Sequence, residues 1–170
     1  YLPAILSEIT SANQPANIID EITAATKLQG GAALIAPTMA KANAPCYIVS
    51  GGFDFLTKPI ATNLGFKDAF SNRLEIKDGL ITGRVIPPIL GMDAKRQTLE
   101  ALCKANGLNL DQAVTIGDGA NDLAMLSAAG LGIAFQGKPI LRDKVETQLN
   151  FTDLTGLLFL QGYNSNDIFR

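Results

Sequence analysis

The chain has 170 residues, a formal net charge of -2 and a hydrophobic content of 47%. This length suits one compact domain with at most a small appendage, which buries roughly 70% of the surface that the unfolded chain exposes. The charge shows no basic excess, which disfavours nucleic acid and anionic membranes as partners. The sequence has no histidine, so Ser-His-Asp chemistry, Cys-His chemistry and histidine metal sites are excluded within these residues.

The two cysteines, Cys46 and Cys103, are widely separated and form no dense disulfide framework. Such cysteines are typical of reduced thiols, so we expect a cytoplasmic protein. The sequence shows neither a signal peptide nor an apolar run long enough to cross a membrane. It begins with Tyr1 rather than with methionine, and we therefore expect it to be the downstream part of a longer protein.

The first part of the chain is expected to be mainly helical. Residues 1–28 predict short helices, the second of which begins at Asn17, with Asp20 as the acidic residue of its first turn. Residues 30–43 predict a further helix, kinked at its proline. The apolar run at 44–50 then predicts a buried parallel strand that ends in a glycine turn.

A helix and a hairpin are predicted next. Residues 53–64 predict the helix, which Gly65 ends. Residues 73–86 contain two alternating apolar runs about Asp78 and Gly79, and this pattern is a strong signal for a β-hairpin.

The last part of the chain alternates strands with helices. Asp93 is expected to cap a helix with an apolar stripe, and Gly107 is expected to end it. Two buried strands are predicted at 114–117 and 131–135, on either side of a helix over 123–129. Strands separated by helices at this spacing predict an α/β fold with a Rossmann-like parallel sheet and right-handed crossovers.

One candidate for anion binding follows the first predicted parallel strand. Ser50, Gly51 and Gly52 offer a hydroxyl group and accessible backbone N–H groups beyond the carboxyl end of that strand, at the expected start of a helix. Phosphate is the anion that this arrangement suits. The alternative is a tight turn between strand and helix that binds nothing.

Two carboxylates follow the strand predicted at 114–117. Asp118 and Asp122 lie about one helical turn apart, and two carboxylates that close repel unless a cation lies between them. Oxygen ligands favour a hard divalent ion, Mg²⁺ above all, and Asn121 can add an amide to a bound anion. The alternative is an Asp-Gly turn followed by an acidic helix cap.

Lys95 lies in the first turn of the helix that Asp93 is expected to cap, where the helix macrodipole disfavours a cation. A residue that breaks a local rule is a candidate for function, and an exposed lysine near a helix start is the alternative. Together, Lys95, Ser50 and the two carboxylates indicate a phosphoryl-transfer site that works by positioning and charge neutralisation. That set of residues contains no nucleophile.

Several segments in order resemble the phosphoserine phosphatases of the haloacid dehalogenase superfamily. These segments read VSGGF, TGRV, PILG, AVTIGDGANDLAML and DLTGLLFLQGY. The resemblance extends over nearly the whole chain from about Ile18. It implies a Mg²⁺-dependent phosphatase with a small phosphomonoester as substrate.

The resemblance also implies how phosphate is held. The serine matching Ser50 and the backbone at Gly51 bind the phosphate, and the lysine matching Lys95 neutralises its charge. The residue matching Asn121 completes the phosphate shell. Ser50 and Lys95 are thus the expected catalytic residues of this chain.

The metal site implied by the resemblance centres on Asp118, whose counterpart in the family binds Mg²⁺. The aspartate matching Asp122 completes the metal shell. Mg²⁺ is therefore the expected cofactor, with Asp118 and Asp122 as its expected ligands in this chain.

The nucleophile of the family is the first aspartate of a D-x-D-x-T/V motif, and the second aspartate is the general acid and base. This motif lies on the central first strand, before a helical cap. No D-x-D occurs in the 170 residues. We therefore expect residues 1–28 to be part of a helical cap and residues 29–170 to be a core without its first strand.

Without that strand, the segments Tyr47–Ser50 and Val114–Gly117 lose the neighbour that they would share. Buried backbone groups are almost always paired, so we expect these two strands to close up and pair directly. The alternative is a strand supplied by an upstream fragment or by a second copy of the chain.

The leading functional hypothesis is a phosphoserine phosphatase of serine biosynthesis, which forms an aspartyl-phosphate on a residue outside this chain. Lys27 is the first basic residue, so the cap lacks the family's arginine for the serine carboxylate, and we expect a weak preference for phosphoserine. The alternatives are a non-catalytic relative that binds phosphate and metal, and an unrelated nucleotide-binding module, for which no glycine-rich fingerprint is present.

Overall fold

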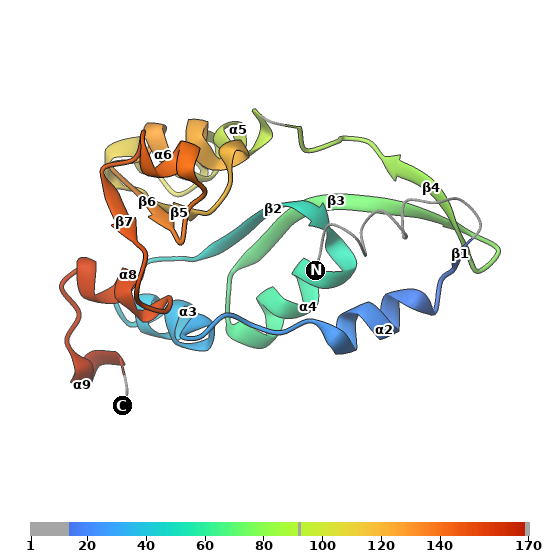
Figure 1. Ribbon diagram of the computed structural model, residues 1–170, viewed down its shortest axis with the longest axis horizontal. Helices are drawn as coiled ribbons and strands as arrows, with labels where there is room; N and C mark the ends of the chain where they lie inside the picture. The colour runs from blue at the N-terminus through green and yellow to red at the C-terminus, as the bar shows by residue number, and fades with distance from the viewer. Residues whose placement is uncertain (1–13, 92, 169–170) are drawn as a thin grey trace. The chain divides into compact units, whose positions relative to one another are not determined.

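The computed structural model describes residues 14–91 and 93–168 as an α/β protein in two compact units (Figure 1). The first unit joins the residues up to Leu28 to Tyr47–Ile89, and the second joins Gln29–Cys46 to Leu90–Arg170. The expected division into a partial cap over residues 1–28 and a core over residues 29–170 stays a prediction.

Within the described residues, the first unit is a four-stranded sheet with two helices. The strands run in the order β1-β4-β3-β2, in which β2 is parallel to β3 and the others are antiparallel. Figure 1 shows both helices on one side of the β3–β4 hairpin. The elements are β1 (Gln14–Pro15), α2 (Ile18–Ala25), β2 (Tyr47–Phe53), α4 (Asp54–Leu64), β3 (Asp68–Lys77) and β4 (Leu80–Ile86).

The core of the first unit forms between the helices and the hairpin. Buried side chains from α2, α4 and the strands meet there: Ile22, Phe53, Leu56, Leu74 and Ile81. The turn of the hairpin has positive φ at both Asp78 (52°) and Gly79 (75°), as a type I′ turn requires. The helix predicted to begin at Asn17, the helix predicted over 53–64 and the predicted hairpin are confirmed, whereas the two-residue strand β1 was not predicted.

The second unit contains a three-stranded parallel sheet in the order β5-β6-β7. Its helices include α3, which contacts α8 and α9. The elements are α3 (Ala32–Lys41), α5 (Ala94–Ala105), β5 (Val114–Gly117), α6 (Leu123–Ala128), β6 (Leu131–Phe135), α7 (Pro139–Arg142), β7 (Thr147–Leu149), α8 (Thr155–Leu160) and α9 (Ser165–Ile168), with 3-10 turns at Leu110–Gln112 and Ala120–Asp122.

The core of the second unit lies under α5 and α6. Apolar side chains spaced along these helices pack with residues of β6, of α7 and of the segment after α7. The buried cluster consists of Leu99, Cys103, Met125, Leu126, Ala134, Leu141 and Val145. The predicted parallel α/β sheet is confirmed. The short helices predicted before Asn17 lie outside the described residues.

The expected direct pairing of the strand at Tyr47–Ser50 with the strand at Val114–Gly117 is wrong. Among the described residues, β2 pairs with β3 alone and β5 pairs with β6 alone, in separate sheets. The expectation assumed buried strands, but Tyr47 to Ser50 are only half-buried and Val114 is 37% exposed. Water can satisfy the backbone groups of such edges, so the penalty that would drive closure is small.

Candidate active site

The segment after β5 folds into a tight turn that depends on its glycines. A Cβ atom on Gly117 would lie 2.5 Å from the Cβ of Asp122, and one on Gly119 would lie 2.5 Å from Oδ1 of Asn121. Real Cβ atoms do not approach other atoms this closely, so a larger residue at 117 would displace Asp122, whereas the amide of Asn121 can rotate away from one at 119. Gly117 therefore lets the side chain of Asp122 fold back over the end of the strand.

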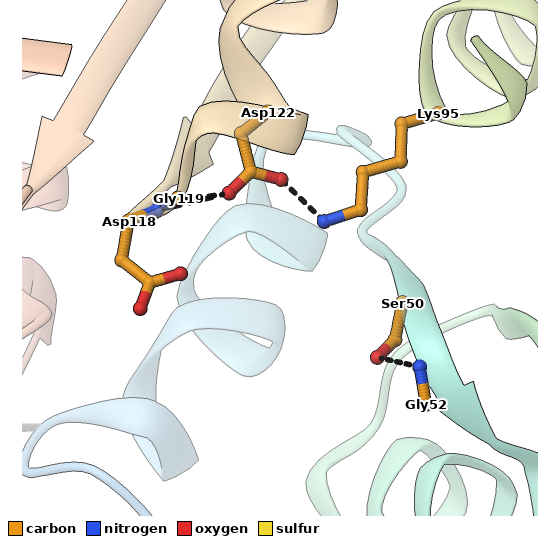
Figure 2. Close-up of polar contacts among 6 residues, drawn as sticks. All are labelled: Ser50, Gly52, Lys95, Asp118, Gly119 and Asp122. Atoms are coloured by element: carbon orange, nitrogen blue, oxygen red, sulfur yellow. Dashed lines mark hydrogen bonds and ion pairs between the residues drawn. The ribbon is translucent and has the colours of Figure 1, made fainter. Parts of the chain in front are cut away.

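Asp122 holds the turn together. Its carboxylate is buried, at 3% exposure, and Oδ2 accepts hydrogen bonds from the backbone N–H groups of Asp118 at 3.1 Å and Gly119 at 3.0 Å. Oδ1 accepts a hydrogen bond from Nζ of Lys95, which makes an ion pair (Figure 2). Both oxygens of Asp122 are thus used by groups of the protein.

Lys95 stands at the second position of α5, and its side chain is 13% exposed. An ammonium group carries three donors, so its bond to Asp122 leaves donor capacity for an anion. Asp93 precedes the helix but makes no side-chain cap, contrary to the expected capping. The side chain of Lys95 is therefore largely buried in an ion pair with Asp122, and its role in neutralising phosphate stays a prediction.

Asp118 differs from Asp122 in its exposure and in the partners of its carboxylate. It is exposed, and within the part of the chain that the structure describes its carboxylate has no hydrogen-bond or ion-pair partner. Figure 2 shows this side chain directed away from the Lys95–Asp122 pair. A cavity of about 310 Å³ adjoins it, lined by Gln29, Ile116, Gly117, Asp118, Phe135, Gln136 and Leu154.

Ser50, Gly51 and Gly52 belong to the first unit and form a bulge in β2. Val49 pairs with Phe70 and Phe53 pairs with Asn72, so three residues of β2 lie opposite one residue of β3. The Gly52 N–H donates to Oγ of Ser50 at 3.0 Å (Figure 2). The α4 helix begins only at Asp54, so these residues do not form the helix start that the sequence predicted.

Gly51 has open space above it. It is exposed, its φ lies outside the left-handed range, and a Cβ built on it would meet no described atom within 4 Å. Neither backbone strain nor crowding therefore requires a glycine at this position. A ligand that must approach the backbone closely would require it.

Two residues of interest were not predicted from the sequence. Asn72 is buried, at 7% exposure, and its Nδ2 donates to the carbonyl oxygen of Gly51 at 2.9 Å. Gln136 follows β6 with a φ of 45°, which is unusual for a residue other than glycine. A polar residue at a buried position of an alternating strand was the available signal for Asn72, whereas none marked Gln136.

Asn121 is exposed, and its side chain turns toward Gly119. The structure thus brings Lys95, Asp122 and the backbone at Asp118 together within the second unit. The roles of Asn121 and Ser50 in binding phosphate, and that of Asp118 in binding metal, stay predictions. The described residues contain no group of three or more histidine, cysteine or acidic side chains that could hold a metal ion.

Residues 6–127 match the model of the haloacid dehalogenase-like hydrolases. The chain is 40% identical over 159 residues to phosphoserine phosphatase SerB2 from Mycobacterium tuberculosis. The matched stretch covers 94% of this chain and 39% of that protein. It is 46% identical over 111 residues to a phosphoserine phosphatase from Methanocaldococcus jannaschii, covering 65% of this chain and 53% of the relative.

Solved structures show the same similarity. A substrate-bound phosphoserine phosphatase complex superposes with a TM-score of 0.85 at 35% identity, covering 91% of this chain and 74% of the other. A probable phosphoserine phosphatase from Vibrio cholerae gives a TM-score of 0.86 at 29% identity, with coverage of 91% and 48%. The chain spans about half or less of the length of the curated relatives described above.

Proposed function

Because the chain belongs to the haloacid dehalogenase-like hydrolases, among the phosphoserine phosphatases, we propose that it carries the metal and phosphate sites of a phosphoserine phosphatase. The observation that supports this most is the network of Lys95, Asp122 and the Asp118–Gly119 backbone. This network holds the ammonium group of Lys95 in place. Among the described residues it leaves the carboxylate of Asp118 without a partner at the end of a parallel strand, where ligands bind in such folds.

The residues fit Mg²⁺ in part. Mg²⁺ prefers oxygen ligands, keeps several waters and is usually bound by one or two carboxylates together with substrate phosphate. Asp118 would hold it, and the bound ion would polarise the phosphoryl oxygens. Asp122 fits the role of a ligand less well, because its two oxygens already accept three hydrogen bonds. Its contacts support a role in positioning Asp118 and Lys95.

Lys95 would neutralise charge on the transferred phosphoryl group through the donors that Asp122 leaves free. Ser50 and the backbone at Gly51 would bind phosphate oxygens. Charge neutralisation and positioning supply most of the catalysis in phosphoryl transfer. These residues therefore account for binding and orientation, and for the stabilisation of the transition state.

The nucleophile would be an aspartate outside these 170 residues, since they contain no D-x-D motif. That aspartate would form an aspartyl-phosphate, which water then hydrolyses. Phosphoserine as substrate, serine biosynthesis as pathway and the cytoplasm as location are part of the proposal. Among the described residues, none of the helices combines the length and apolar character needed to cross a lipid bilayer.

A non-catalytic protein that binds phosphate and metal is the second candidate. The absence of a D-x-D motif favours it. The coding sequence upstream of Tyr1 separates the two candidates, because a D-x-D-x-T/V motif in frame supports the enzyme. A start codon directly before Tyr1 supports the binding protein.

The experiment uses an extended protein, in which this chain follows a segment that carries a D-x-D-x-T/V motif. We expect it to release phosphate from phosphoserine with Mg²⁺, and to lose this activity in Asp118→Asn. Glu146→Gln removes another exposed carboxylate of the same unit and is expected to keep the activity. Equal activity of Asp118→Asn and the unsubstituted protein would contradict the proposed metal site.

A further inference from the structure

The peptide unit between Gly51 and Gly52 is held at both ends. Nδ2 of Asn72 donates to the carbonyl oxygen of Gly51 at 2.9 Å, and the N–H of Gly52 donates to Oγ of Ser50 at 3.0 Å. The carbonyl and the N–H belong to one planar trans peptide and point in opposite directions. These two hydrogen bonds therefore fix the rotation of this peptide plane.

Without Asn72, little else in the local sequence would resist rotation of this peptide. Two consecutive glycines have the widest conformational freedom of any dipeptide. The bulge also places Ser50 to Gly52 outside the regular pairing of β2 with β3. Asn72 comes from β3, in register with Phe53, so it reaches the bulge from a strand that is fixed independently.

The orientation of this peptide decides what Ser50 can donate. A serine hydroxyl has one hydrogen and two acceptor sites. Since the N–H of Gly52 occupies one acceptor site, the hydroxyl hydrogen is directed elsewhere and is available to an anion. If the peptide were reversed, the carbonyl of Gly51 would face Ser50 and would accept that hydrogen.

We propose that Asn72 is a positioning residue for phosphate: it orients the Gly51–Gly52 peptide so that Ser50 presents its hydroxyl hydrogen to a phosphate oxygen. This inference rests on the proposed function, because it assigns the anion at Ser50. The open space above Gly51 supports it independently, since neither backbone strain nor crowding requires a glycine there.

A merely structural role for Asn72 makes a different prediction, and Thr57 provides the matched control. Thr57 is also buried, at 8% exposure, and its Oγ1 lies 2.6 Å from Oγ of Ser71, the residue before Asn72. Thr57→Val removes a buried hydrogen bond to the same strand but does not touch the glycine peptide. Both substitutions should disturb packing, and only changes at Asn72 should release the peptide.

The first measurement is amide hydrogen exchange of Gly52 by NMR in the 170-residue chain. Asn72→Ala and Asn72→Asp are expected to lower the protection of this amide about tenfold or more, as loss of a hydrogen bond worth about 1.4 kcal/mol would. Thr57→Val is expected to leave it within about twofold of the unsubstituted protein. Equal protection in the Asn72 and Thr57 variants would overturn the proposal.

The second measurement is inhibition of the extended protein by inorganic phosphate, expressed at each pH as a ratio to the unsubstituted protein. Asn72→Asp is expected to weaken inhibition by phosphate about tenfold at pH 8. The ratio to the unsubstituted protein should recover towards pH 5.5. Burial raises the pKa of the introduced carboxyl, and its protonated form can donate to the Gly51 carbonyl. Asn72→Ala should show the loss without the recovery.

The outcomes separate this proposal from the proposed function. Faster exchange at Gly52 with unchanged phosphate inhibition would overturn the role in phosphate binding. A pH-independent loss in Asn72→Asp, equal to that in Asn72→Ala, would also contradict it. If the unsubstituted extended protein neither hydrolyses phosphoserine nor binds phosphate, the proposed function fails. In that case the exchange of Gly52 still decides whether Asn72 holds the peptide.

Discussion

Lys95 forms an ion pair with Asp122, although the two residues are 27 positions apart in the sequence. The lysine stands near the start of α5, where the helix macrodipole is unfavourable for a cation. The ion pair offsets this cost, because the carboxylate of Asp122 is almost fully buried. Since Asp122 also accepts from the backbone of Asp118 and Gly119, one carboxylate ties the helix to the turn after β5 (Figure 2).

We expect Lys95→Met to destabilise the protein by about 3 kcal/mol, because it leaves the buried carboxylate of Asp122 without its cation. Urea denaturation followed by circular dichroism measures this free energy of unfolding. Arg96→Met is the matched control, since Arg96 makes an exposed pair with Glu100 on the same helix, and such pairs contribute about 0.3–0.5 kcal/mol. Similar losses in both variants would show that the Lys95–Asp122 pair adds little.

The turn around Asp118 could be predicted from the sequence because its signal is local. Gly117 and Gly119 flank the first carboxylate, Asp122 follows four residues later, and the strand and helix on either side have clear apolar patterns. The partner of Lys95 could not be predicted, because it depends on how α5 packs against α6. Sequence pattern places each residue on its element but does not state which elements meet.

The contact of Asn72 could not be predicted either, because it also depends on which elements meet. Its contact with Gly51 exists only because β3 pairs in parallel with β2, and the predicted hairpin began one residue later, at Arg73.

The prediction of β2 as a buried strand was wrong because burial depends on neighbours on both sides. Among the described residues, β2 has a paired strand on one side alone.

The glycines Gly51 and Gly117 are expected to respond oppositely to substitution by alanine. Gly117→Ala should destabilise the protein by about 1–3 kcal/mol, because the new Cβ would overlap the side chain of Asp122. Gly51→Ala should change stability by less than about 0.5 kcal/mol, since its Cβ would meet no described atom within 4 Å. Thermal unfolding of both variants tests this.

In the extended protein, Gly51→Ala is nevertheless expected to weaken inhibition by inorganic phosphate about tenfold or more, because the methyl group would occupy the approach to the backbone. A stable Gly51→Ala variant with unchanged phosphate inhibition would show that no anion approaches this backbone. A strongly destabilised one would show that the glycine serves the fold.

The thiol of Cys46 is expected to react slowly with iodoacetamide at neutral pH. Burial raises the pKa of this thiol from 9.0 to about 11, and the thiolate is the reactive form. The folded protein therefore keeps the proton between pH 9 and 11, where the unfolded chain has lost it. The rate of alkylation at Cys46 should rise about tenfold per pH unit up to at least pH 10.

Mass spectrometry of the peptide that contains Cys46 measures this rate, and the same peptide in urea is the control. The control should reach a plateau near pH 9, since its cysteine has an ordinary pKa. A plateau at the same pH in the folded protein would contradict the burial of this thiol. Because the raised pKa favours the protonated folded state, stability should also fall as the pH rises above 9.

The most direct test of the central claim compares phosphate release from phosphoserine by the 170-residue chain and by the extended protein, both with Mg²⁺. If this chain supplies the metal and phosphate sites but not the nucleophile, the chain alone should show no turnover. The extended protein should approach the enzyme median of about 10 s⁻¹. Turnover by the chain alone, or none by a folded extended protein, would contradict the account.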